Sequence, residues 1–300
     1  MTYKNRNCPI CNETHKTGIL FQKENIAAHK MSSFTYASRK NPEFMCHEMI
    51  RCKRCDLVYV ANPPESLELA ENYHNASYDS SSEAADAAET YSHNIGDILN
   101  KIGHDARIME IGAGSGDFLS KLKKQGYKNL VGIEPSVSAI EEANNNIKNH
   151  LVHGVFNKND FNGSSFDLVC CFMTLEHVYD PRVIADDVIN LLKKGGYFVV
   201  VVHNYRSMIN TALGRKSPII DIEHMQLFSP SSINFLFSQA KYKDISAKSF
   251  TNTYSIIYWI RLIPLPNPIK KYLIRVLTFL RIGNLKVNIN VGNIIVHGKK

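Results

Sequence analysis

The segment 107–118 constrains the fold more than any other part of this sequence. An apolar-rich run ends in an acidic residue, and Gly112, Gly114 and Gly116 then alternate with small residues before a helix-forming stretch begins. This order predicts a strand, a tight turn and a helix start, which is how an open α/β sheet presents backbone N–H groups to a ligand. Side chains in place of these glycines would keep the ligand away from the backbone.

The spacing of the glycines distinguishes between nucleoside ligands. A dinucleotide fingerprint has a third glycine three residues after its second, and counting from Gly114 that position is Asp117. The carboxylate of Glu110 would repel a pyrophosphate and attract an ammonium group. Glu134 closes the next apolar run, about 20 residues beyond the loop, where such sheets hold a ribose diol. Glu134 therefore indicates a nucleoside without choosing between cofactors.

From residue 106 onward, apolar runs alternate with helical patterns, which predicts an α/β fold: a doubly wound, Rossmann-like sheet of seven strands. The run 197–202 is wholly apolar and β-branched, as a parallel strand covered on both faces should be. The expected strands are 107–111, 129–134, 151–156, 166–173, 197–202, 242–250 and 287–297. The expected helices are 65–73, 84–102, 180–194 and 231–240.

Two Cys-x-x-Cys pairs precede this region. Cys8 and Cys11 form the first pair, and Cys52 and Cys55 form the second. Two such pairs complete a tetrahedral four-sulfur zinc site, which has no open coordination position, so we expect a structural role. The alternative is a redox pair, but that function needs a single pair at a strand-to-helix junction. We expect a small zinc-binding subdomain at 1–75 and a larger domain at 76–300.

The charge distribution and hydropathy of the sequence exclude some classes of function. The formal net charge is +7, but the basic residues are scattered apart from a denser C-terminal stretch, so no nucleic-acid partner is expected. No apolar run reaches the length of a bilayer span, and the polar start is unlike a signal peptide. We therefore expect a cytoplasmic protein whose seven cysteines are thiols or metal ligands.

Several of these stretches resemble one family. The Glu-x-Gly-x-Gly-x-Gly pattern resembles motif I of the class I S-adenosylmethionine (SAM) methyltransferases, and 166–178 and 191–196 resemble the regions of their fourth and fifth strands. The stretch 223–229 is similar to the Glu-His-x-x-x-Phe-Ser element of sugar C- and O-methyltransferases. Those enzymes also carry an N-terminal cysteine-pair zinc module, joined by a segment similar to 73–82.

The resemblance covers nearly the whole chain. It implies SAM as cofactor, a structural zinc ion, and methyl transfer to a hydroxyl or carbon of a sugar or nucleotide-sugar in surface-polysaccharide or natural-product biosynthesis. The deoxysugar C-methyltransferases continue into a further C-terminal domain that this sequence does not show, which favours O-methylation. The apolar, basic stretch 254–284 is expected to be a packed insertion; the alternatives are a lid over the acceptor, or a patch that contacts a membrane or a lipid-linked substrate.

The residues expected to act follow from these motifs. We expect His224 to be the general base, with Glu223 beside it as an orienting group, because the pKa of an unperturbed histidine lies near neutrality. The alternative for His224 is a histidine that steadies its loop. The expected cofactor-binding residues are Glu110, Gly112 and Gly114 at the methionine tail, Glu134 at the ribose, Phe156 beside the adenine, His177 in the pocket wall, and Tyr78 over the tail.

Two other functions compete with methyl transfer. The first is a nicotinamide-dependent oxidoreductase on a similar sheet, which Asp117 at the third glycine position argues against. The second is a non-catalytic SAM-binding zinc module, which the intact carboxylates Glu110 and Glu134 argue against.

Overall fold

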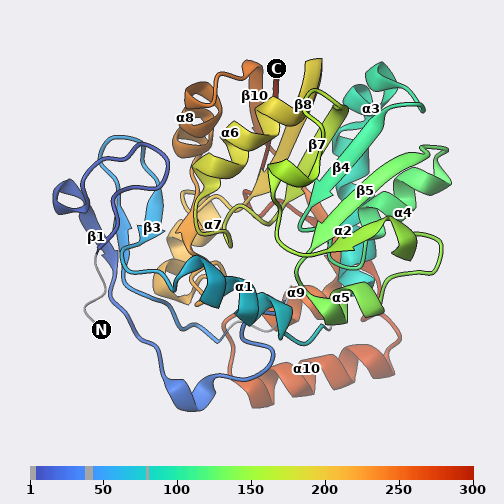
Figure 1. Cartoon of the computed structure of the whole chain (residues 1–300). Helices are drawn as coiled ribbons and strands as arrows, with labels where there is room; N and C mark the ends of the chain where they lie inside the picture. The colour runs from blue at the N-terminus through green and yellow to red at the C-terminus, as the bar shows by residue number, and fades with distance from the viewer. Residues whose placement is uncertain (1–4, 38–42, 79–80) are drawn as a thin grey trace.

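The computed structural model describes residues 5–37, 43–78 and 81–300. Its main feature is a sheet with the strand order β10-β13-β8-β7-β4-β5-β6, in which β13 runs antiparallel to both of its neighbours and the strands from β8 to β6 are parallel (Figure 1). The strands of this sheet are β4 (Arg107–Ile111), β5 (Asn129–Glu134), β6 (Leu151–His153), β7 (Phe166–Phe172), β8 (Leu192–Val202), β10 (Lys243–Ser249) and β13 (Ile294–Lys299). This is the predicted Rossmann-like α/β fold with a seven-stranded sheet.

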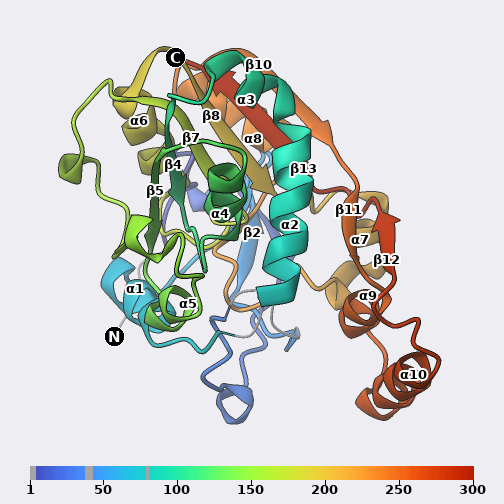
Figure 2. The ribbon, with the colours of Figure 1, turned by 90° about the vertical axis from the view of Figure 1, so that its right-hand side faces the viewer.

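Helices cover both faces of the sheet (Figure 2). Because side chains alternate along a strand, Met109 and Ile111 of β4 pack on the side of α6 and α8, whereas Ile108 packs on the side of α2 and α4. The helices are α1 (Ser66–His74), α2 (Ser81–Asn94), α3 (Gly96–Ile102), α4 (Asp117–Lys124), α5 (Val137–Glu141), α6 (Pro181–Leu191), α7 (Met208–Leu213), α8 (Pro230–Gln239), α9 (Ile256–Leu262) and α10 (Asn267–Phe279). Short 3-10 helices lie at His15–Thr17, Ala28–Lys30, Lys148–His150, Lys158–Asp160 and Gly214–Lys216.

Some predicted boundaries were wrong for local reasons. The expected helix 84–102 is divided at Ile95, where the backbone leaves the helical region before Gly96. The expected last strand is divided at Gly292, which has a φ of +86°, so that only its second part joins the main sheet. Gly195 and Gly196 lie within β8, where the pairing with β7 is irregular, and the preceding helix ends at Leu191.

The N-terminal segment forms a second sheet with the order β1-β2-β3-β9. Its strands are β1 (Ile19–Gln22), β2 (Met49–Arg51), β3 (Val58–Val60) and β9 (Gln226–Leu227). Because β9 follows β8 in the chain, this sheet joins the N-terminal segment to the loop that carries His224. The guanidinium of Arg6 strengthens the joint by donating to the carbonyls of Val60 and Met225.

A C-terminal excursion separates β10 from β13. It consists of β11 (Asn252–Ser255), α9, α10 and β12 (Lys286–Ile289), and β11 pairs with β12 as an antiparallel ribbon. In both views α10 lies at the edge of the molecule, on the far side of α9 from the main sheet (Figure 1, Figure 2). Within the described residues, none of the helices is both long enough and apolar enough to cross a membrane.

Candidate active site

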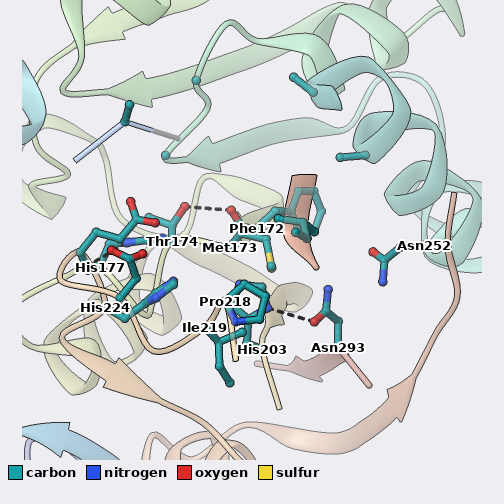
Figure 3. A pocket seen from close by; sticks show the side chains of 18 of the residues that line it. Phe172, Met173, Thr174, His177, His203, Pro218, Ile219, His224, Asn252 and Asn293 are labelled. Carbon is teal, nitrogen blue, oxygen red and sulfur yellow. Dashed lines mark hydrogen bonds between the residues drawn. The ribbon is translucent and has the colours of Figure 1, made fainter. Parts of the chain in front are cut away.

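A cavity of about 660 Å³ lies where the parallel strands β4, β5, β7 and β8 end at their carboxyl edge (Figure 3). This is the edge at which open α/β sheets bind their ligands. Eight of the predicted catalytic and cofactor-binding residues line the cavity: Tyr78, Glu110, Gly112, Gly114, Glu134, His177, Glu223 and His224. The structure therefore brings together residues that are up to 146 positions apart in the chain, from Tyr78 to His224.

The glycine loop shapes one wall of the cavity. Gly112 and Gly114 both have a positive φ, +74° and +55°. A Cβ atom on Gly112 would lie 2.2 Å from Oγ1 of Thr174, whereas a Cβ atom on Gly114 would meet no atom within 4 Å. Gly112 is thus required by the packing of the protein itself, and Gly114 leaves open space that a ligand can fill.

Glu134 is held rigidly beside this loop. Its Oε2 accepts a hydrogen bond of 2.7 Å from the backbone N–H of Gly114, and its Oε1 accepts one of 2.8 Å from that of Ser136. The side chain is 8% exposed, and this burial raises its pKa while the two backbone donors act in the opposite direction. Each carboxylate oxygen has a second acceptor position, so Glu134 can still accept from two hydroxyl groups of a ligand.

Three histidines meet in the wall of the cavity. The ring of His224 stacks on that of His177, with centroids 4.8 Å apart, and meets the ring of His203 edge-on at 5.5 Å. His203 lies within hydrogen-bonding distance of Asn293, with 3.0 Å between Nδ1 and Oδ1 (Figure 3). His224 itself is 4% exposed. The cluster thus offers several ring nitrogens to a group placed in the cavity.

Glu176 positions this cluster through hydrogen bonds to the backbone of the loops that carry the histidines. It is fully buried, and its Oε1 accepts a hydrogen bond of 2.6 Å from the backbone N–H of His203. Its carbonyl oxygen accepts from the backbone N–H of Met225, the residue after His224. Burial raises the pKa of Glu176 to about 8. The sequence placed Glu176 in a motif, but only the fold shows that it ties together the loops of two histidines.

Tyrosines of the N-terminal half complete the wall. The hydroxyl of Tyr73 lies 3.0 Å from Nδ1 of His177 and donates to the carbonyl of Glu223. Burial raises the pKa of Tyr73 well above its ordinary value, so this hydroxyl remains a donor. The hydroxyl of Tyr78 lies 2.6 Å from Oγ of Ser115, in the glycine loop.

The C-terminal excursion forms the remaining wall. Tyr254, Tyr258, Trp259, Leu262 and Ile263 line the cavity. The indole Nε1 of Trp259 donates to the carbonyl of Val287, which fixes α9 to the β11–β12 ribbon. The first part of the stretch 254–284 therefore contributes to the cavity wall, whereas α10, farther along it, has no buried residue.

Phe156 is the predicted site residue that the structure places elsewhere. It does not line the cavity but packs, half-buried, against the core cluster on the α6 and α8 side of the sheet. The reason is that β6 ends at His153, so the chain has already left the sheet edge before Phe156. The prediction of an adenine contact is thus not supported. Pro135, Ser136 and Ala139 line the cavity next to Glu134 instead.

The four paired cysteines form a separate cluster. Their sulfur atoms all lie within 4.8 Å of one another, with 3.4 Å between Cys8 and Cys55 and 3.5 Å between Cys11 and Cys52. Ligand sulfurs around a tetrahedral zinc ion are about 3.8 Å apart, given a zinc–sulfur distance of about 2.3 Å. The donor set and its spacing thus fit a four-coordinate metal. None of the four cysteines lines the cavity.

Comparisons with known proteins agree with this geometry. Residues 83–247, just over half of the chain, match a family model described as a methyltransferase domain. The ubiquinone biosynthesis O-methyltransferase of Coxiella burnetii is 26% identical over 114 residues, which cover 36% of this chain and 48% of that protein. The chain thus spans about half the length of the curated relatives it matches.

Several solved structures align with a large part of this chain. A SAM-dependent methyltransferase from Archaeoglobus fulgidus aligns with 79% of this chain and 100% of its own, at 16% identity and a TM-score of 0.49. A possible histamine N-methyltransferase from Thermotoga maritima aligns with 72% of this chain and 90% of its own, at 18% identity and a TM-score of 0.47. Because the family model spans more than half of the chain, the chain belongs to the methyltransferase-domain family.

Proposed function

We propose that the protein transfers a methyl group from SAM to a hydroxyl group of a small polar acceptor, of the sugar or nucleotide-sugar class, with His224 as general base. The observation that carries this proposal is the histidine cluster, which lines the same cavity as the glycine loop. The name of the Coxiella relative specifies transfer to oxygen, and we extend that preference to this chain.

The cofactor fits the glycine-loop side of the cavity. Glu110 and Gly114 would hold the amino-acid tail, and Glu134 would accept from the ribose hydroxyls. The space over Gly114, which a Cβ would enter, suits a ligand that approaches the backbone closely. Bound SAM supplies a methyl carbon on a good leaving group, so the protein's task is to position the acceptor and to remove its proton.

Asn252 indicates what the acceptor must offer. Its side chain is buried in the cavity wall, and its Nδ2 has no hydrogen-bond partner among the described residues. A buried donor without a partner costs roughly 1–3 kcal/mol, which a ligand oxygen can recover. We infer that an oxygen of the acceptor accepts from Asn252 while His224 takes the proton from the reacting hydroxyl. Glu223 and His177 would hold His224 in place.

We assign the N-terminal segment 1–75 to a zinc-binding subdomain and 76–300 to the methyltransferase domain. A zinc ion bound by Cys8, Cys11, Cys52 and Cys55 would be structural, because four thiolates leave no open coordination position. Its contribution to catalysis would be indirect. The segment it stabilises carries Tyr73, whose hydroxyl contacts the histidine loop.

Turnover of labelled cofactor tests the proposal. The protein is incubated with methyl-labelled SAM and a library of nucleotide-linked and lipid-linked sugars. We then compare His224→Ala and His224→Gln with His93→Ala, an exposed histidine of α2 that does not line the cavity. A lost general base should reduce kcat by about 10²–10⁴-fold in the His224 variants and leave binding of S-adenosylhomocysteine unchanged. Normal turnover in both His224 variants would refute the assignment of the base.

A further inference from the structure

The outer face of helix α10 is an exposed surface. It runs from Asn267 to Phe279 and has no buried residue, although α9 packs beside it. Phe279 is 87% exposed and Tyr272 is 67% exposed. Further exposed apolar side chains flank these two along the chain: Ile269, Leu280, Ile282, Leu285 and Val287. These exposed apolar side chains all lie within 19 residues, from Ile269 to Val287. Protein surfaces ordinarily expose large apolar side chains singly and not in such a group.

The same surface is positively charged. The sequence has no aspartate or glutamate after Asp244. Within the described residues, Lys271, Arg275 and Arg281 take part in no ion pair, whereas Lys286 pairs with Asp86 at 2.5 Å. The unpaired cations thus lie on α10 and the turn after it. We refer to residues 267–287 as the basic apolar surface.

Charge and apolar area share one face. Tyr272, Arg275 and Phe279 are spaced by three and four positions, so they lie on one side of the helix. All three are exposed, whereas Leu273, Val276 and Leu277 are half-buried on the other side. Both views show α10 projecting from the edge of the molecule rather than lying over the sheet (Figure 1, Figure 2). Exposed aromatic and apolar side chains combined with lysines and arginines are features of helices that bind at a membrane interface, where the cations attract acidic headgroups.

We propose that the basic apolar surface binds an anionic lipid bilayer. A bilayer with acidic headgroups offers counterions to Lys271, Arg275 and Arg281 and an apolar layer to Tyr272 and Phe279. A second copy of the chain fits less well, because a symmetric contact would bring the same cations together without any carboxylate from this segment.

Docking in this manner would place the mouth of the cavity at the membrane. Ile263, in the connection between α9 and α10, both lines the cavity and is 45% exposed, so it lies at the rim. Trp259 and Leu262 continue the apolar wall inward. The consequence for substrate, which rests on the proposed function, is an acceptor whose polar head is methylated while an apolar chain reaches back to the bilayer.

Vesicle co-sedimentation tests the proposal without any methyl transfer. The full-length protein is mixed with vesicles of phosphatidylcholine alone or with 30 mole per cent phosphatidylglycerol, a composition of about one third anionic lipid. We expect binding to the anionic vesicles only. Each basic residue near such a surface contributes about fivefold in partitioning, so the variant Lys271→Gln, Arg275→Gln, Arg281→Gln should bind about a hundredfold less.

Two further variants complete the design. Tyr272→Ser with Phe279→Ser should also lose binding, because it removes the apolar contact and keeps every charge. Lys124→Gln, Lys128→Gln, Lys248→Gln removes three exposed charges elsewhere and should bind like the wild type. Equal loss in this control, or no preference for anionic vesicles, would overturn the proposal. So would a wild-type dimer that the Phe279→Ser change dissociates, which would assign the surface to a second copy.

Discussion

Replacing Gly114 by alanine separates what the cofactor needs from what the fold needs. The backbone of Gly114 has a φ of +55°, which costs a non-glycine residue about 1–2 kcal/mol. The added Cβ would meet no protein atom within 4 Å, so no cost of overpacking is added. In the absence of ligand, Gly114→Ala should therefore lower Tm by only about 2–4 °C, at about 2 °C per kcal/mol.

Gly114→Ala should weaken cofactor binding much more than it lowers the stability of the fold. Gly114 lines the cavity, and its N–H donates to Glu134, so the new methyl group would enter the space assigned to the tail of SAM. We expect affinity for S-adenosylhomocysteine to fall at least tenfold. At a ligand concentration of 100 times the wild-type Kd, wild-type protein gains about 2.7 kcal/mol in unfolding free energy, and a tenfold weaker binder gains about half of that. Thermal unfolding with and without ligand measures both effects.

Gly112→Ala is the matched control. Its φ of +74° imposes a similar strain, but its Cβ would also lie 2.2 Å from Oγ1 of Thr174. That overlap should add about 1–3 kcal/mol to the loss of stability without ligand. The two variants should thus differ in opposite directions: Gly112→Ala is the less stable, and Gly114→Ala keeps its fold but loses its ligand. A full ligand-induced shift in Gly114→Ala would show that the cofactor does not lie against this loop.

Three further predictions concern other parts of the molecule. The pKa of Glu176 is raised from its ordinary value of 4.5 to about 8 in the folded chain. Between about pH 5 and pH 8 the folded chain therefore keeps a proton that the unfolded chain releases. The unfolding free energy should fall as the pH rises through this range. Glu176→Gln cannot ionise and should not show this decline. Urea titrations at pH 5, 7 and 9 measure the unfolding free energy of both proteins, and the same pH dependence in the two would contradict the assignment. Metal analysis should find one zinc ion per chain in the wild type and in Cys46→Ser, but none in Cys8→Ser or Cys52→Ser. A wild-type protein that contains no zinc even after preparation with added zinc would refute the site. Trp259→Ala should raise the acceptor KM roughly tenfold and leave affinity for S-adenosylhomocysteine unchanged, because the ring lines the apolar end of the cavity; an unchanged KM would remove α9 from the acceptor wall.

The sheet could be predicted because its signals are local. A wholly apolar run such as that in β8 has few other places in a fold, and the glycine loop after β4 marks both a strand end and a helix start. Once the strands are known, the carboxyl edge of the sheet follows. His177 could be expected at this edge for this reason, and it lines the cavity there.

The parts of the site that could not be predicted from the sequence depend on contacts between segments that are distant in the chain. Nothing in the sequence around Asn252 indicates a cavity wall, because its position depends on the ribbon that β11 forms with β12. Phe156 lies outside the cavity because β6 ends at His153, and the end of such a short strand cannot be read from its apolar residues alone. The role of Glu176 could not be inferred either, since it depends on hydrogen bonds from the distant residues His203 and Met225.

Isothermal titration of the wild-type protein with S-adenosylhomocysteine and with NADH tests the central claim most directly. The cavity combines Gly114, open to a close ligand, with the carboxylates Glu110 and Glu134, which should favour a sulfur nucleoside with an amino-acid tail over a pyrophosphate. We predict one S-adenosylhomocysteine bound per chain, no heat from NADH, and loss of the binding heat in Glu134→Ala. Stoichiometric binding of NADH without any response to S-adenosylhomocysteine would contradict the assignment of this cavity.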